Sequence, residues 1–173
     1  MTAIVVLIVL AYLLGSVPSG YVLGKLAGVD VRDVGSGNIG AANVARAVGK
    51  WPGALTLVAD ATKGFLPVSI AIQLEWEPFA IAGTAVAVFL GHLYPLFLKF
   101  RGGKGVATAL GALLAVAPLA TLALLALFAL VAFFSRIVSL SAMAAAVAAP
   151  QGAQVQRVVR LPVVGLGRFD RQN

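Results

Sequence analysis

The sequence contains no cysteine, a single histidine and only six acidic residues in 173 positions. Without cysteine there is no disulfide framework, no thiolate metal site and no cysteine nucleophile. One histidine and six acids leave little material for a metal cluster, so we expect no bound metal. Charged residues of either sign make up only 11% of the chain, whereas a soluble domain carries roughly 25%. The chain therefore lacks the polar surface that a water-facing globule needs.

Hydrophobic residues, by contrast, make up 61% of the chain, and the mean hydropathy is +1.01. This composition predicts an integral membrane protein. The formal net charge is +7, but a water-soluble nucleic-acid binder would not be this apolar, and we expect no nucleic-acid partner. We expect instead that basic loops lie beside anionic lipids and anionic substrates.

Apolar runs predict an all-α, polytopic helical bundle of about five hydrophobic segments, because a bilayer-crossing helix needs about 20 largely apolar residues. The first run is interrupted by Gly15, Pro18 and Gly20. It lacks the basic start and the cleavage site of a signal peptide, so we expect it to be a span. The fourth run contains a long span, and the fifth is marginal for a full crossing. The runs are residues 1–24, 51–74, 79–98, 105–135 and 137–150.

The loops between these runs differ in charge. Residues 23–50 hold four basic and two acidic side chains, residues 99–104 hold three basic and no acidic ones, and the turn around Glu75 and Glu77 is acidic. Because cytoplasmic loops carry an excess of Lys and Arg, we expect both basic loops in the cytoplasm and the amino terminus outside. Two spans separate the basic loops, so the topology also places them on one side.

Two opposite charges, Asp60 and Lys63, lie three residues apart inside the second run. This spacing places them on one helix face, and we favour a structural pair in which each charge neutralises the other. A substrate role stays open, because charges inside membrane spans are functional candidates by default.

The first basic loop combines glycines with hydrogen-bonding side chains. Glycines let backbone amides approach an anion closely, and the Arg46 guanidinium fits phosphate oxygens. A flexible turn would need the glycines but not the polar set, so we favour an anion site. The loop also matches a dinucleotide fingerprint, which we reject because no buried strand precedes it. The residues concerned are Gly35, Ser36, Gly37, Asn38, Gly40, Asn43 and Arg46.

The second basic loop carries Gly102, Gly103 and Lys104 just before an apolar run. It differs from a P-loop, which requires Ser or Thr directly after the lysine, where this chain has Gly105. Glycines beside a lysine at the start of a helix still predict a phosphate cradle. His92, at the end of the preceding run, is the single histidine, and we slightly favour a functional role for it over a structural one.

Two runs of this sequence resemble motifs of the bacterial acyl-phosphate-dependent glycerol-3-phosphate acyltransferases, the PlsY type. Residues 36–46 read Ser-Gly-Asn-Ile-Gly-Ala-x-Asn-Val-x-Arg. Residues 91–108 read Gly-His-x-x-Pro-x-Phe-Leu-x-Phe-x-Gly-Gly-Lys-Gly-Val-Ala-Thr, a long and specific match. Residues 15–20 match a feature of the family's first span, so the resemblance extends over about residues 1–150.

The resemblance implies an all-helical enzyme of the cell inner membrane whose active site faces the cytoplasm. Such an enzyme moves a fatty acyl group from acyl phosphate to glycerol 3-phosphate, giving 1-acylglycerol 3-phosphate (lysophosphatidate) in phospholipid synthesis. It implies no metal or organic cofactor. Its partners are glycerol 3-phosphate, acyl phosphate and membrane lipids, and we expect a monomer.

Because an acyl phosphate is already activated, such an enzyme needs no covalent nucleophile, but it must hold two anions together and stabilise developing charge. On the resemblance we assign Ser36, Asn38 and Arg46 to the acyl-phosphate head group. Lys104 and the two glycines before it hold the phosphate of glycerol 3-phosphate. Either His92 or a substrate phosphate oxygen accepts the proton of the attacking hydroxyl. The predicted catalytic residues are Ser36, His92 and Arg46, and the predicted substrate-binding residues are Gly37, Asn38, Gly40, Asn43, Gly102, Gly103, Lys104 and Thr108.

The carboxyl-terminal stretch departs from the family, whose members continue with a basic third motif of the Arg-His-x-x-Asn-Ile-x-Arg kind. We therefore divide the chain into a membrane-embedded, acyltransferase-like domain (residues 1–150) and a basic, divergent tail (residues 151–173). The tail suggests a truncated or frame-shifted product, or a natural variant. Two alternatives to an active acyltransferase stay open, a small anion transporter and a catalytically impaired membrane remnant.

Overall fold

The computed structural model describes residues 1–135, and the expected fifth run and basic tail lie outside the described residues. The described elements are all helices, as the composition predicted. They fall into two units, one of residues 1–116 and one that begins at residue 117, and each is described by itself. The predicted site residues all belong to the first unit.

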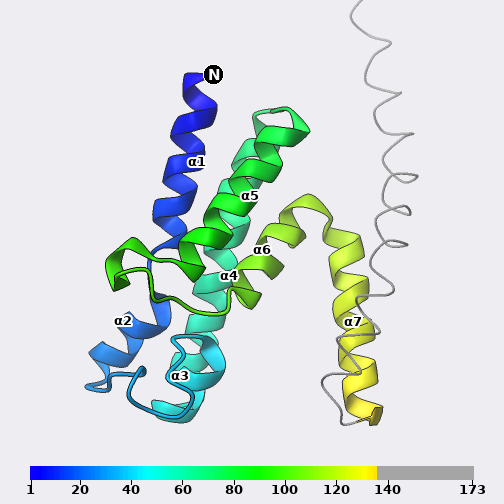
Figure 1. Cartoon of the computed structure of the whole chain (residues 1–173). Helices are drawn as coiled ribbons and strands as arrows, with labels where there is room; N and C mark the ends of the chain where they lie inside the picture. Colours follow the sequence, from blue (N-terminus) through cyan, green and yellow to red (C-terminus); the bar gives the residue numbers. More distant parts are fainter. Residues whose placement is uncertain (136–173) are drawn as a thin grey trace, which may run out of the picture. The chain divides into compact units, whose positions relative to one another are not determined.

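Three apolar stretches of the first unit are long enough to cross a membrane, and they confirm the first three predicted runs. The first, Thr2–Leu26, contains the helices α1 (Thr2–Gly15) and α2 (Ser19–Leu26). The others are α4 (Lys50–Gln73) and the stretch Pro78–Leu98, which holds α5 (Pro78–Leu93) and a 3-10 turn, η1 (Leu96–Leu98). In Figure 1, α1, α4 and α5 lie side by side, and the short α3 (Ala41–Ala47) lies at the far end of α4 from the α4–α5 turn.

The first span breaks between Gly15 and Pro18, where the sequence has its predicted interruption. A break inside a membrane span leaves carbonyl groups without helical partners, which is costly in a water-poor environment. Here the Lys63 Nζ atom donates a hydrogen bond of 2.8 Å to the carbonyl of Val17. A buried lysine of α4 therefore helps to satisfy the backbone at the break.

The uncharged stretch 105–135 is divided, although we expected it to contain one long span. It forms α6 (Val106–Val116) and α7 (Pro118–Ser135), with the division at Ala117. Pro118 explains the division, because proline has no N–H to donate, its ring clashes with the carbonyl four residues earlier, and it disfavours helical geometry in the residue before it. At about 1.5 Å per residue, the 11 residues of α6 are about 16 Å long, too short to cross a bilayer.

Helices α4 and α6 pack closely because glycines replace side chains where the backbones meet. A side chain at Gly64 would collide with the carbonyl of Thr108, and one at Gly111 would collide with the carbonyl of Ala61. Small residues at such contacts let membrane helices approach each other closely. This contact brings the start of α6, where the second motif ends, beside the charged pair of α4.

A small apolar cluster joins the two basic loops. Val31, Ile39 and Val44 from the first loop and α3 pack with Leu98 of η1, and all four side chains are buried. Burial of this apolar surface stabilises the contact between segments that lie far apart in the sequence. The two motif-bearing loops are therefore held together at one end of the bundle.

Candidate functional site

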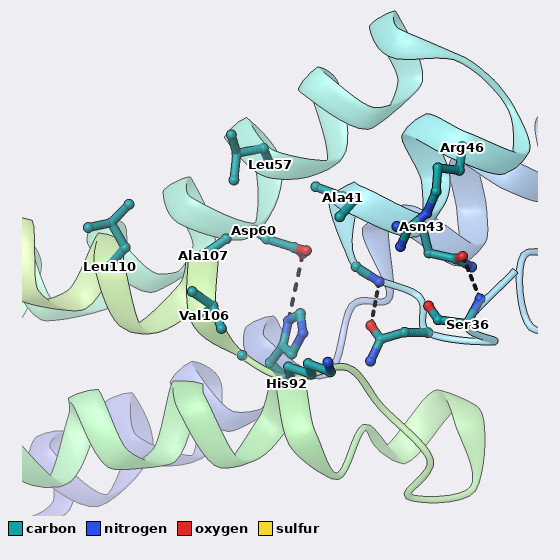
Figure 2. A pocket seen from close by; sticks show the side chains of 15 residues that line it. Ser36, Ala41, Asn43, Arg46, Leu57, Asp60, His92, Val106, Ala107 and Leu110 are labelled. Atoms are coloured by element: carbon teal, nitrogen blue, oxygen red, sulfur yellow. Dashed lines mark hydrogen bonds and ion pairs between the residues drawn. The ribbon is translucent and has the colours of Figure 1, made fainter. Parts of the chain in front are cut away.

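The two motif-bearing loops, α3, α4, the end of α5 and the start of α6 enclose a pocket with a cavity of about 300 Å³. Figure 2 shows side chains of these elements converging on it. Its polar lining comes mostly from the first loop and α3, and its apolar lining comes mostly from α4 and α6. The pocket is lined by Ser36, Asn38, Gly40, Ala41, Ala42, Asn43, Arg46, Leu57, Asp60, His92, Lys104, Gly105, Val106, Ala107 and Leu110.

Asn43 holds the first loop in shape. Its side chain is only 2% exposed, and its Nδ2 atom donates to the carbonyls of Val31 at 2.8 Å and Val34 at 3.0 Å. Its Oδ1 atom accepts a bond of 3.0 Å from the Ser36 amide, drawn as a dashed line in Figure 2. Backbone partners thus occupy the Asn43 side-chain amide, so the main effect of Asn43 at the pocket is to position Ser36.

Asn38 closes the turn that leads into α3. Its Oδ1 atom accepts a hydrogen bond of 2.8 Å from the Gly40 amide, a local bond typical of Asn in turns. Gly37 has a φ of +67°, a conformation that side chains rarely adopt. Gly37 therefore shapes the loop without lining the pocket, whereas Asn38 and Gly40 do line it.

Two cationic side chains reach the pocket, Arg46 from α3 and Lys104 from the second loop. Both are exposed, and the ion pairs of the described residues include neither of them. Their charges are therefore available to an anion in the pocket. Ser36 is also exposed, and it lines the same pocket.

Gly102 and Gly103 serve the backbone of the second loop. Their amides donate to the carbonyls of Leu93 at 3.1 Å and His92 at 3.2 Å, at the end of α5. These two amides are consequently engaged within the chain, and neither glycine lines the pocket. A side chain at Gly103 would collide with the His92 Nε2 atom, so only a glycine lets the backbone of the second loop pack against that edge of the imidazole.

Buried polar groups lie beneath the loops. His92, on α5, is 4% exposed, and its Nδ1 atom shares a hydrogen bond of 3.1 Å with the Thr108 hydroxyl of α6. The same Nδ1 atom lies 3.7 Å from the Asp60 Oδ1 atom of α4, as Figure 2 shows. Asp60 also pairs with Lys63 at 2.9 Å. Three helices thus contribute to one buried polar cluster, which we call the α4–α6 cluster: Asp60, Lys63, His92 and Thr108.

The predicted pairing of Asp60 with Lys63 is confirmed, but this pairing is only part of what Asp60 does. Asp60 also lines the pocket and faces His92. Sequence reasoning favoured a structural pair, although a charge inside a membrane span is a functional candidate by default. That general expectation was the sequence signal that could have indicated a place for Asp60 in the site.

The structure brings seven of the predicted site residues to the pocket: Ser36, Asn38, Gly40, Asn43, Arg46, His92 and Lys104. Four others, Gly37, Gly102, Gly103 and Thr108, lie behind this lining and shape the loops or contact His92. The structure adds Asp60 and an apolar wall of Leu57, Val106 and Leu110. Sequence reasoning missed this wall because apolar residues do not stand out in an apolar chain.

A second charge network, away from the pocket lining, supports the first loop. Asp30 accepts hydrogen bonds from the Arg32 side chain at 2.9 and 2.7 Å and pairs with Lys25 at 3.0 Å. The Arg32 guanidinium also lies 4.6 Å from the centre of the Tyr21 ring. The hydrogen bond from Arg32 holds the pKa of the Asp30 carboxyl below its usual range, so this carboxylate keeps its charge.

The fold and the site together define a helical membrane protein with a cationic pocket, built from glycine-rich loops at one end of the bundle. Residues 5–166 match the family model described as glycerol-3-phosphate acyltransferase, and the chain belongs to this family. The match continues beyond residue 150, where we expected the resemblance to end.

Relatives and solved structures agree with this assignment. The chain is 54% identical over 114 residues to a glycerol-3-phosphate acyltransferase of Geotalea daltonii and 55% identical over 107 residues to one of Rubrobacter xylanophilus. These matches cover 66% and 62% of this chain but only 59% and 54% of the relatives, so the chain spans little more than half of their length.

Two crystal structures of PlsY, described as an integral membrane glycerol 3-phosphate acyltransferase, are similar to the chain. One, in the glycerol 3-phosphate form, has a TM-score of 0.78 at 37% identity and covers 99% of this chain and 96% of that chain. The other, in the lysophosphatidic acid form, has a TM-score of 0.77 at 43% identity and covers 85% of this chain and 74% of that chain.

Proposed function

We propose that this chain transfers a fatty acyl group from acyl phosphate to the hydroxyl of glycerol 3-phosphate, which gives lysophosphatidate and inorganic phosphate. The observation that carries the proposal is the pocket, which is lined by Arg46 from the first motif and by Lys104 from the second. Beside these cations lies an apolar wall of Leu57, Val106 and Leu110. Two anionic groups and one aliphatic chain are the chemistry that such a lining favours.

The relatives support the same substrates. Their names specify glycerol-3-phosphate acyltransferase, and the two PlsY structures are described as a glycerol 3-phosphate form and a lysophosphatidic acid form. The two motif runs that carry the resemblance supply most of the polar lining of the pocket. We therefore extend these substrates to this chain.

Four polar side chains of the pocket have parts in this reaction. Arg46 and the Ser36 hydroxyl bind the phosphate of the acyl donor, which leaves as a dianion, so a fixed cation stabilises the charge that develops on it. Lys104 binds the phosphate of glycerol 3-phosphate and brings its hydroxyl to the carbonyl carbon. His92, or a phosphate oxygen of the bound substrate, accepts the proton of that hydroxyl.

The acyl chain of the donor lies along the apolar wall. Leu57 is 49% exposed and Val106 is 73% exposed, and exposed apolar side chains of a membrane protein face lipid. A chain of the donor therefore passes from lipid into the pocket without crossing polar surface. We propose that the protein lies in the inner membrane with its pocket on the cytoplasmic side, because the loops that line the pocket carry the excess of basic residues. We also propose that the monomer is the active form.

The test is an acyl-transfer assay on the purified chain in lipid vesicles with acyl phosphate and labelled glycerol 3-phosphate. A parallel reaction contains acyl-CoA in place of acyl phosphate. We expect labelled lipid to form with acyl phosphate and not with acyl-CoA. We expect its rate of formation to fall at least about 100-fold in Ser36→Ala. Ser69→Ala, which changes a serine of α4 away from the pocket, is the matched control.

Two outcomes contradict the proposal. Product formed equally well from acyl-CoA overturns the choice of donor. A folded protein that forms no labelled lipid with either donor overturns transfer by this chain, and uptake of labelled glycerol 3-phosphate into sealed vesicles would then support the alternative of a transporter.

A further inference from the structure

The pocket is small compared with its proposed substrates. Its cavity measures about 300 Å³, whereas a cavity of about 150 Å³ holds a single benzene molecule. On that scale the pocket has room for roughly a dozen non-hydrogen atoms. Glycerol 3-phosphate and the head group of an acyl phosphate together already exceed this number. A long acyl chain therefore lies mostly outside the pocket.

The pocket is closed on the side where α4 and α6 meet. Ala107 and Leu110 line it, and the residues that directly follow them, Thr108 and Gly111, lie at the contact between the two helices. A side chain at Gly111 would collide with the carbonyl of Ala61. The two backbones therefore leave no room for an aliphatic chain to pass between the helices at this contact.

The apolar wall, by contrast, is open. In Figure 2, Leu57, Val106 and Leu110 lie on the side of the pocket opposite the first loop. Leu57 is 49% exposed and Val106 is 73% exposed, although both line the pocket. About one turn beyond Leu110 along α6, Leu113 is also exposed but does not line the pocket. A donor chain that follows this wall consequently passes from the pocket into lipid within a few carbons.

We infer that the pocket selects its acyl donor by the phosphate head group and the first few carbons, so that the length of the remaining chain does not affect turnover. The donors then form one chemical class, the acyl phosphates of medium and long chain length. This inference deepens the proposed function and rests on it for the identity of the head group.

The bonds that change are the same for every member of this class. The hydroxyl oxygen of glycerol 3-phosphate forms a bond to the carbonyl carbon, and the bond from that carbon to the bridging oxygen breaks with its electron pair left on phosphate. The hydroxyl proton ends on the released phosphate. None of these atoms belongs to the distal chain, so only contacts near the carbonyl can differ between the ground state and the transition state.

Chain length still affects how much donor reaches the enzyme. Each added methylene favours transfer from water to lipid roughly four-fold, so longer donors accumulate in the membrane. The KM expressed as a total concentration therefore falls with chain length. We expect kcat, and the KM expressed as a mole fraction of the membrane lipid, to stay constant.

The test compares octanoyl, lauroyl and palmitoyl phosphate as donors for the purified chain in lipid vesicles, with the membrane-bound fraction of each donor measured by sedimentation. We expect kcat and the mole-fraction KM to agree within about 3-fold among the three donors. A larger difference in kcat would overturn the inference, because it would show that the protein discriminates between chains by their length.

Two variants locate the point where recognition of the chain ends. Val106→Ala shortens a side chain of the wall, and we expect kcat/KM to fall about 3- to 10-fold for octanoyl and palmitoyl phosphate alike. Leu113→Ala shortens an exposed side chain of the same helix outside the pocket, and we expect both donors to react as with the wild type. A loss in Leu113→Ala that is confined to palmitoyl phosphate would overturn the inference, because it would place the distal chain on α6.

Binding without turnover separates this inference from the proposed function. Octanoyl and palmitoyl phosphonates, in which a methylene group replaces the bridging oxygen, cannot transfer their acyl groups. At equal mole fraction in lipid nanodiscs, we expect both to raise the melting temperature of the wild type equally and that of Arg46→Ala less.

Equal stabilisation by both phosphonates, with no lipid product from any acyl phosphate, would overturn the proposed function and support selection by the head group. Stabilisation by palmitoyl phosphonate alone, or by neither compound, would overturn the inference.

Discussion

The two sides of the pocket are built differently. On the loop side, Asn43 and Asn38 hold the first loop through bonds to backbone atoms at most 12 residues away. On the helix side, Asp60, His92 and Thr108 come from three helices and meet through tertiary packing. The cations Arg46 and Lys104 are exposed, whereas the polar side chains contributed by the three helices are buried. The comparison shows that the local part of the site holds its exposed cations, whereas the buried polar cluster depends on how three helices pack together.

The largest expected effect is on the loop side. Arg46→Ala and Lys104→Ala each remove a cation that lines the pocket, and kcat/KM for acyl transfer is expected to fall by about 10²–10³ because developing negative charge loses its partner. Arg101→Ala removes an exposed cation of the second loop outside the pocket lining and is the control. Equal losses in all three variants would mean that general basic charge, and not the pocket, binds the substrates.

The next effect is on the stability of the first loop. Asn43→Ala removes three hydrogen bonds from a side chain that is 2% exposed, and we expect a loss of about 2–3 kcal/mol because buried partners are left unsatisfied. Thermal unfolding in detergent measures it. Asn38→Ala removes one bond from a half-buried side chain and is expected to cost about 1 kcal/mol. A smaller loss of stability in Asn43→Ala than in Asn38→Ala would contradict the role of Asn43 in holding the first loop.

A similar effect is expected on the helix side. Gly64→Ala places a methyl group against the carbonyl of Thr108, which forces α4 and α6 apart and is expected to cost about 1–3 kcal/mol. Gly83→Ala is the matched control, because its methyl group would meet only the end of the Ile8 side chain at 3.3 Å. Thermal unfolding of the two variants, compared at one pH, decides whether the α4–α6 contact has the tight packing described here.

The smallest effect is a pH dependence of the first loop. Because Arg32 lowers the pKa of Asp30 below its usual value of 3.8, the ion pair stabilises the fold fully above that value and loses its contribution as the pH falls through the lowered pKa. The wild type is therefore expected to lose slightly more stability than Asp30→Asn between pH 5 and pH 3. Melting curves at these pH values measure the difference, and parallel pH dependence in both proteins would contradict it.

Much of the fold could be predicted because membrane-spanning helices are recognisable as long apolar runs in the sequence. The first three apolar runs coincide with the long apolar stretches of the structure to within two residues at their starts, since about 20 consecutive apolar residues have few alternatives to a spanning helix. The division at Ala117 was not predicted. Pro118 was visible, but uniform hydrophobicity around it concealed the end of one helix and the start of another.

The site was predictable where its residues are contiguous. Ser36, Asn38 and Arg46 lie within one short run, so their types and spacing are enough to indicate an anion site. The position of Asp60 beside His92 was not predictable, because the separation of two residues in the sequence does not determine the distance between the helices that carry them. The roles of Gly102 and Gly103 also differ from the expected phosphate cradle, since their amides bond to the end of α5.

The sequence by itself determined that this protein lies in a membrane, which segments form long apolar helices, and which two loops carry cations and glycines. These properties follow from local composition. Only the tertiary structure decided that Arg46 and Lys104 line one pocket and that Asp60 lies 3.7 Å from His92. The physical reason is that such distances depend on how closely α4 and α6 approach each other. That approach depends on backbone contacts at glycines such as Gly64 and Gly111.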